Sequence, residues 1–255
     1  MSAMQLISLN LTPNSTVWWA DSVSRWALIV AITVAFSALG RLVRGVSNTG
    51  AIAGAVVCFA LLASVGPAAF TALLVVFAVT WLATRFGRAG KLRMGVAERK
   101  EGRSASQVLA NTGMAAACAV CYSALHAPLM LLGMAAALAV AAADTVSSEC
   151  GQALSREARL ITTFEKVPAG TDGGVTLAGT MAGALAALLV SLVGMWMGLL
   201  STRWVWIAAG AGVLGMVIDS LLGALFERHG WIGNDSVNFI STVMAAVAAA
   251  GVAGF

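Results

Sequence analysis

Long uninterrupted apolar runs constrain this chain more than any other feature of its sequence. Eight such runs, at 23–43, 50–65, 67–86, 106–125, 127–144, 175–199, 203–226 and 236–254, approach the length needed to cross a bilayer. The chain has 255 residues, of which 60% are hydrophobic and 10% charged, so little remains for a soluble domain. The runs are continuous rather than alternating, which disfavours a β-barrel. We therefore expect residues 1–255 to form a single integral membrane domain, an all-α polytopic bundle of about eight transmembrane helices.

The placement of basic residues predicts the orientation of these helices. With eight spans, 13 of the 15 Lys and Arg residues fall on one side of the membrane, and only Arg25 and Arg203 fall on the other. Basic loops face the cytoplasm. We therefore expect a multi-pass protein of the cell (inner) membrane with both termini outside the cytoplasm. All acidic residues except Asp21 lie on or near the basic side, which predicts a cleft facing the cytoplasm. This placement explains the net charge of +4 without a nucleic-acid partner.

Arg103, Gln107 and Asn111 stand at i, i+4 and i+8 at the start of the fourth span. This spacing places one cation and two amides on one helix face that descends about 12 Å into the membrane. Amides at such depth need partners. Two interpretations stay open, namely hydrogen bonds between helices and a stripe that faces a phosphate.

Three carboxylates lie on or within apolar runs: Asp144 and Glu149 at the end of the fifth, and Asp219 inside the seventh. An unpaired carboxylate inside the membrane is costly, and a helix C-terminus disfavours an anion such as Asp144. A hard cation would compensate, because Mg²⁺ takes carboxylate oxygens and substrate phosphates. We predict that these three residues converge on Mg²⁺. The alternative for Asp219 is a hydrogen bond to Asn111 or Gln107.

A glycine-rich turn formed by Gly170, Thr171, Asp172, Gly173 and Gly174 precedes the sixth span. Thr171 or Asp172 can cap the following helix, and glycines leave backbone N–H groups accessible to an anion. The turn is not a Walker A loop, because no Gly-Lys-Ser/Thr follows. A phosphate cradle and a plain capped turn both remain possible.

Three further polar residues are candidate ligands of a substrate. Lys166 precedes the glycine-rich turn, while Asn234 and Asn238 share one face at the start of the eighth span, where Asn234 is a plausible cap. The pair Cys118 and Cys121 has the spacing of a metal motif, but it lies in an apolar run without a second pair, so we expect no metal there.

These residues in this order resemble a known integral membrane family, whose plant member is the phytyl-phosphate kinase of the vitamin E pathway. The matching stretches are Arg103-x3-Gln107-Val108-x-x-Asn111, Asp144-Thr145-x-x-Ser148-Glu149-x-Gly151, Val167-Pro168-x-Gly170-Thr171-Asp172-Gly173-Gly174-Val175, Asp219-Ser220-x-x-Gly223-Ala224 and Asn234-x-x-Val237-Asn238. The chain departs from the family at Val146, where an aromatic residue is usual.

The resemblance implies an enzyme that phosphorylates an isoprenyl monophosphate with a nucleoside triphosphate and Mg²⁺ at the cytoplasmic membrane face. The catalytic residues implied are Arg103, Asp144, Glu149 and Asp219, of which the three acids bind the metal. The substrate- and nucleotide-binding residues implied are Gln107, Asn111, Lys166, Gly170, Thr171, Asp172, Gly173, Gly174, Asn234 and Asn238. The sequence agrees with this chemistry, because phosphoryl transfer to a phosphate needs no side-chain nucleophile.

Three alternative functions stay open. A transporter binds its substrate near the bilayer midplane, whereas here the polar residues crowd one face. A cytidylyltransferase acting on a lipid phosphate would also use Mg²⁺ and a nucleotide, but it would release pyrophosphate. A non-catalytic membrane scaffold would leave the intramembrane Asp219 unexplained.

Overall fold

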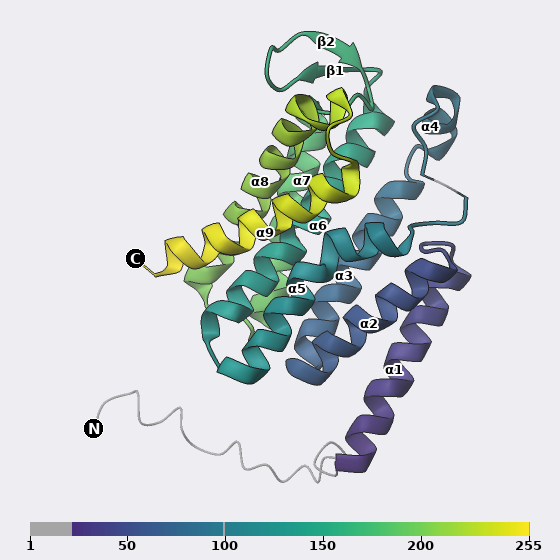
Figure 1. The fold of residues 1–255 in the computed structure, drawn as a ribbon. Coiled ribbons are helices and arrows are strands. Elements are labelled where there is room, and N and C mark those ends of the chain that lie inside the picture. Colours follow the sequence, from purple (N-terminus) through teal and green to yellow (C-terminus); the bar gives the residue numbers. More distant parts are fainter. Residues whose placement is uncertain (1–21, 99, 255) are drawn as a thin grey trace.

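The computed structural model describes residues 22–98 and 100–254 (Figure 1). Its apolar helices are α1 (Ser22–Leu42), α2 (Asn48–Ser64), α3 (Pro67–Arg85), α5 (Ala105–Leu125), α6 (Pro128–Leu154), α7 (Leu177–Trp196), α8 (Thr202–Leu225) and α9 (Asn234–Ala253). Within the described residues, seven of these helices are long and apolar enough to cross a membrane, while α2 has 17 residues. The predicted fold class, an all-α polytopic membrane bundle, is confirmed. The predicted places of the N-terminus and of Asp21 lie outside the described residues.

Short polar signals set the ends of these helices. Proline occupies the first turn of α3 and α6, where its missing N–H costs no hydrogen bond. A Ser or Thr side chain accepts a backbone N–H at the start of four helices: Ser47 for α2, Ser104 for α5, Thr176 for α7 and Ser201 for α8. Gly66 adopts a φ of 100°, which permits the tight turn between α2 and α3.

The polar gaps contain structure that the apolar pattern does not predict. The α3–α5 gap contains the short helix α4 (Arg88–Met94). The α6–α7 gap contains strands β1 (Glu157–Leu160), β2 (Lys166–Pro168) and β3 (Gly174–Val175), which pair antiparallel in the order β2-β1-β3. The turn η2 (Glu227–His229) precedes α9. The strands and α4 lie at the same end of the bundle, at the top of Figure 1.

Helix α6 is the central helix of the bundle and packs against α3, α5, α7, α8 and α9. Its residues from Leu132 to Ala143 are all buried, and most of them are alanine or another small residue. Glycines on the neighbouring helices allow an equally close approach. A Cβ atom on Gly215 of α8 would lie 2.4 Å from a methyl carbon of Val140, and one on Gly183 of α7 would lie 2.6 Å from the carbonyl oxygen of Ala143. Small residues therefore bring the polar ends of these helices together.

We expect Gly215→Val to destabilise the protein by about 1–3 kcal/mol, because the new side chain overpacks the α6–α8 contact. Gly210→Val is the matched control, since Gly210 lies on the same helix, is exposed and has no atom within 4 Å of an added Cβ. Thermal unfolding in detergent measures both. Equal melting temperatures for the two variants would contradict the packing described here.

Candidate active site

A polar pocket with a volume of about 240 Å³ lies at the end of the bundle that carries the β-strands. Its walls come from α5, α6, α8 and α9 and from the loop between β2 and α7. Thirteen of the fourteen predicted site residues line it: Arg103, Gln107, Asn111, Asp144, Glu149, Gly170, Thr171, Asp172, Gly173, Gly174, Asp219, Asn234 and Asn238. The tertiary structure thus gathers residues that are up to 135 positions apart, counted from 103 to 238.

Lys166 is the predicted residue that the structure places elsewhere. Its ammonium lies 2.9 Å from the carboxylate of Glu157 across the β1–β2 hairpin, and both side chains are 65% exposed. Hydrogen bonding to this ammonium lowers the pKa of the Glu157 carboxyl. Lys166 does not line the polar pocket, so its position does not support the predicted contact with a nucleotide.

Asp144 and Asp219 form the acidic centre of the pocket. Their side chains interact directly, and Ser241 of α9 donates a hydrogen bond of 3.0 Å to Oδ2 of Asp219. Asp219 is buried, whereas Asp144 is partly exposed. Two carboxylates in contact repel each other unless a proton or a cation lies between them. The sequence left Asn111 or Gln107 as the alternative hydrogen-bond partner of Asp219. In the structure, Asp219 contacts Ser241 and Asp144 instead.

Asp144 does not lie at the C-terminal end of its helix, where we expected it from the sequence. Helix α6 continues for ten residues beyond Asp144, to Leu154, so this carboxylate lies inside the helix and not at the negative end of its dipole. This C-terminal stretch of α6 packs against the start of α7. At Gly151, a Cβ would lie only 2.8 Å from the hydroxyl of Thr176.

We predicted that Asp144, Glu149 and Asp219 converge on one point. Among the described residues, Glu149 pairs with a lysine instead. Glu149 lies five positions after Asp144, on another side of α6, and its Oε2 is 2.5 Å from Nζ of Lys91. Lys91 belongs to α4 and is completely buried, and it also donates to the carbonyls of Ala83 and Thr84 at the end of α3. Glu149 therefore faces the pocket as one member of an ion pair, and the carboxyl pair is left with two members.

Arg103 lies just before α5 rather than on it, because Ser104 is the N-cap. Its backbone is fixed to the α1–α2 loop: its N–H donates to Gly45 at 3.1 Å, and its carbonyl accepts from Ser47 at 2.9 Å. Gly50 makes room, since a Cβ there would lie 2.1 Å from the Arg103 carbonyl oxygen. The guanidinium reaches across to α6 and donates to Thr145 at 3.2 Å. Arg103 is thereby directed at the residue next to Asp144.

The amide side chains of the pocket mostly bond within their own helices. Gln107 accepts from the backbone of Ser104 at 2.8 Å in a capping box, and Asn111 donates to the Gln107 carbonyl at 3.0 Å. Asn238 donates to Oδ1 of Asn234 at 3.0 Å. Asn234 is the first residue of α9, and the preceding glycine is the N-cap, so the predicted cap is wrong. In these contacts, Gln107 and Asn111 form no hydrogen bond to another helix.

The glycine-rich turn does not cap the next helix. Thr176 is the N-cap of α7, so Thr171 and Asp172 lie too early in the chain for that role. The N–H of Gly174 donates back to the Thr171 carbonyl at 2.8 Å. Partial desolvation raises the pKa of the Asp172 carboxyl, and the nearby charge of Arg228 opposes this rise. The phosphate-cradle interpretation stays a prediction.

Gly173 is required by packing whatever the turn binds. Its φ is 74°, and a Cβ would lie 2.5 Å from the backbone nitrogen of Ala224 on α8. Gly223 makes the reciprocal approach, because a Cβ there would lie 2.9 Å from the nitrogen of Gly173. The two glycines of different motifs therefore join the turn to the end of α8, directly beside Asp219 and Ser220 in the pocket wall.

The oxygen donors of the pocket fit a hard divalent cation. Besides the two carboxyl groups, Oδ1 of Asn238 is buried without a hydrogen-bond partner, as is Oε1 of Gln152. Mg²⁺ is usually held by one or two carboxylates plus substrate phosphates and keeps several waters. Within residues 22–98 and 100–254 no group of three or more His, Cys, Asp or Glu side chains is placed to hold a metal. The protein side of such a site is therefore the pair and not a cage.

Several pocket residues have no counterpart among the predicted ones. They are Glu98, Thr145, Ser147, Ser148, Gln152, Ser220 and Glu227. Glu227 contacts Asn234 through a hydrogen bond and thereby joins η2 to α9. Their spacing gives part of the signal, since Thr145 and Ser148 lie within the acidic motif. Lys91 and Ser241 carry no motif signal, because each acts only through a partner distant in sequence.

The apolar helices make this protein an integral membrane protein. Its candidate site is a polar pocket at one end of the bundle, and the pocket contains two interacting carboxyl groups. The chain belongs to the integral membrane protein family DUF92, whose match covers residues 31–246. The family resemblance inferred from the motifs is thereby confirmed.

Three relatives illustrate the breadth of the similarity. An uncharacterized membrane protein of Methanocaldococcus jannaschii is 35% identical over 204 residues, which cover 80% of this chain and 84% of the relative. The chloroplastic protein VTE6 of Arabidopsis thaliana is 30% identical over 259 residues, covering 98% of this chain and 76% of the relative. Protein PGR of the same plant is 32% identical over 233 residues, covering 81% and 80%. No solved structure matches.

Proposed function

We propose that this protein is a kinase that transfers a phosphoryl group from a nucleoside triphosphate to an isoprenyl (phytyl-type) monophosphate. The observation that carries the proposal is the contact between Asp144 and Asp219 in a polar pocket otherwise surrounded by apolar helices, with Arg103 directed at the neighbouring Thr145. The motif resemblance to the phytyl-phosphate kinase family and the similarity to VTE6 support the same chemistry.

In the proposed reaction an anionic oxygen of the acceptor phosphate attacks the terminal phosphorus of the donor. A phosphorus–oxygen bond forms, the bond to the leaving nucleoside diphosphate breaks, and no protein nucleophile is required. Arg103 holds and neutralises phosphate oxygens through its guanidinium fork, and its backbone ties to the α1–α2 loop keep it in place. Buried Asp219 is oriented by Ser241, so its charge needs no reorganisation during the transfer.

Mg²⁺ is the proposed cofactor. When bound, it would neutralise the charge on the transferred group and on the leaving diphosphate. Asp144 and Asp219 would hold it, with the unpartnered Oδ1 of Asn238 as a further oxygen donor. Glu149 would act through its ion pair with Lys91, which fixes the end of α6 beside the pocket.

Purified protein with Mg²⁺, each nucleoside triphosphate and a panel of prenyl monophosphates tests the proposal. We expect a prenyl diphosphate and a nucleoside diphosphate as products in equal amounts. Release of pyrophosphate would instead identify a cytidylyltransferase. Substrate movement into vesicles without any chemical product would identify a transporter, and either result would overturn the kinase assignment.

We further propose that the polar pocket faces the cytoplasm, because the loops at this end carry most of the basic residues. A reporter fused after Phe255 is expected to be active outside the cytoplasm. The same reporter inserted at Thr163, an exposed residue of the β1–β2 hairpin, is expected to be active inside it. Two reporters on the same side of the membrane would contradict the arrangement.

A further inference from the structure

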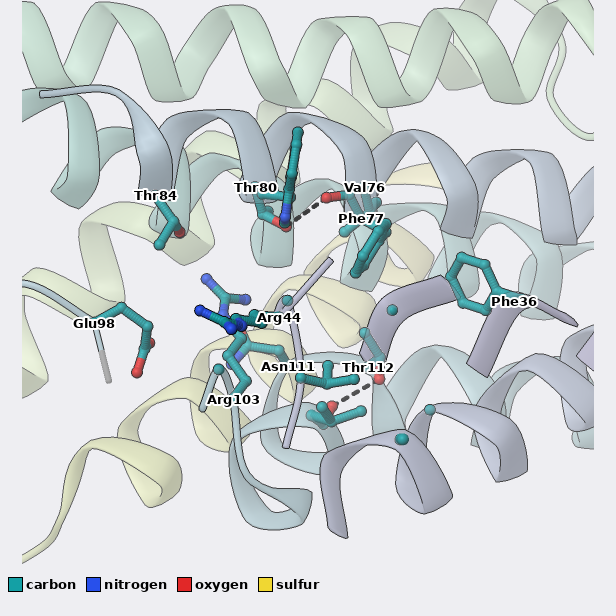
Figure 2. A pocket seen from close by; sticks show the side chains of 18 of the residues that line it. Phe36, Arg44, Val76, Phe77, Thr80, Thr84, Glu98, Arg103, Asn111 and Thr112 are labelled. Carbon is teal, nitrogen blue, oxygen red and sulfur yellow. Dashed lines mark hydrogen bonds between the residues drawn. The ribbon is translucent and has the colours of Figure 1, made fainter. Parts of the chain in front are cut away.

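A second hollow lies between α1, α2, α3 and α5, and its walls are mainly apolar (Figure 2). Phe36 and Phe77 pack edge to face at one end, with ring centroids 5.4 Å apart. The hydroxyls of Thr80 and Thr112 donate to carbonyls of their own helices, Phe77 at 3.2 Å and Val108 at 2.7 Å, so they offer no free donor to the hollow. We call this hollow the apolar groove.

The other end of the apolar groove is strongly basic. Arg44, Arg85, Arg88 and Arg103 line it, and among its described lining residues Glu98 is the one acidic side chain. Figure 2 shows Arg44 and Arg103 side by side, away from the two phenylalanines. Arg44 is held at a φ of 55°, a conformation that costs a non-glycine residue free energy and persists where the surroundings enforce it. An apolar wall that ends in several guanidinium groups complements an amphiphile with an anionic head.

The basic end of the groove is continuous with the polar pocket. Glu98, Arg103 and Asn111 line both hollows. A phosphate bound at Arg103 therefore lies at the boundary between the apolar groove and the pocket that contains the carboxyl pair. Leu73, which also lines the groove, stands twelve residues before Arg85 on α3, so the lining residues of that helix span about 18 Å along its axis.

We propose that the apolar groove binds the lipid acceptor: a single-chain prenyl monophosphate whose phosphate lies at Arg44 and Arg103 and whose adjoining chain lies between Phe36, Phe77 and Leu73. The groove has a volume of about 100 Å³, so it encloses the part of the chain next to the head, and the remainder lies among the lipids. This assignment rests on the proposed function for its choice of ligand, but binding in the groove does not require turnover.

Gly54 offers a direct test, because it lines the groove on α2 and an added Cβ there would meet no atom within 4 Å. Gly54→Phe is expected to fill the groove without overpacking the fold. Gly210→Phe is the matched control, since Gly210 also has open space around it but faces outward on α8. Arg44→Gln is the second variant; Arg44 is exposed, so the exchange does not threaten folding.

Equilibrium binding of geranylgeranyl monophosphate to the full chain in detergent, without nucleotide, is the measurement. We expect Gly54→Phe and Arg44→Gln each to weaken this binding about tenfold. The loss of one hydrogen bond to a charged group, or of apolar contacts with a similar free energy, has an effect of this size. Gly210→Phe should bind the lipid phosphate as tightly as the unaltered protein does. The nucleotide affinity should be unchanged in all variants. Binding of the neutral alcohol geranylgeraniol should fall in Gly54→Phe and not in Arg44→Gln.

Unchanged binding in both variants, absence of binding to the unaltered protein, or equal displacement by a two-chain anionic phospholipid would each overturn the groove assignment. The two proposals fail separately. Groove-dependent binding without phosphoryl transfer would remove the kinase and retain the groove. Phosphoryl transfer with the same KM for the lipid in both variants would retain the kinase and remove the groove.

Discussion

Asp219→Asn is expected to lower the turnover of the proposed phosphoryl transfer by at least about 100-fold, the effect of deleting one preorganised charge from an active site. The exchange keeps the size of the side chain and its contact with Ser241, but it removes the negative charge beside Asp144. The protein should fold normally and be as stable as the original or more so without metal, because the two carboxyl groups no longer repel each other.

Glu165→Gln is the control for this experiment, because it neutralises an exposed carboxylate of the hairpin that does not line the pocket. Initial rates at saturating nucleotide and lipid measure turnover, and thermal unfolding in detergent measures stability. Full turnover in Asp219→Asn would show that the carboxyl pair is not part of the chemistry. An equally large loss of turnover in Glu165→Gln would mean that the assay responds to the total charge of the protein and not to the carboxyl pair.

Lys91→Met is expected to destabilise the protein by about 3–5 kcal/mol, because it leaves the buried carboxylate of Glu149 without its partner. It also removes two hydrogen bonds to the end of α3, so α4 should detach from α6 before the bundle unfolds. Denaturant unfolding in detergent measures the loss, and hydrogen exchange of residues 88–94 reports on α4.

The double variant Lys91→Met with Glu149→Gln separates charge from packing. If the unpaired charge causes the loss, the double variant should recover a large part of the stability, because no charge is left buried. Lys100→Met is the control, since Lys100 is exposed and lies in the same segment between α3 and α5. If Lys91→Met is as stable as Lys100→Met, the ion pair between Lys91 and Glu149 does not stabilise the protein.

The apolar pattern predicts the helices closely and fails where polar residues continue them. The limits of α1, α3, α5 and α8 differ by at most one residue from the predicted runs, because burial in lipid is read directly from hydropathy. Helix α6 extends ten residues beyond the end of the apolar run 127–144, since the DTVSSECGQAL segment is helical but no longer apolar. A hydropathy pattern marks where a helix leaves the lipid and not where its hydrogen bonds end.

The candidate site divides in the same way. Intramembrane acids and amides are costly unless they have partners, so the sequence alone identifies Asp144, Asp219 and Asn238 as functional candidates. Helical spacing cannot say which partner each side chain finds. Glu149 and Asp144 stand in one motif, yet they point to different sides of α6, and only one of them meets Asp219.

The sequence by itself determined the membrane class, the places of the apolar helices, the family and half of the residues that line the polar pocket, because each depends on hydropathy or on motifs local in the chain. Only the tertiary structure decided the partners. Lys91 reaches Glu149 across 58 positions, and Ser241 reaches Asp219 across 22. Most of the apolar groove belongs to no motif, including three of its four arginines: Arg44 of the α1–α2 loop, Arg85 of α3 and Arg88 of α4. The physical reason is that a contact between distant segments depends on their rotation and closeness, which small residues such as Gly215 and Gly223 set where the segments meet.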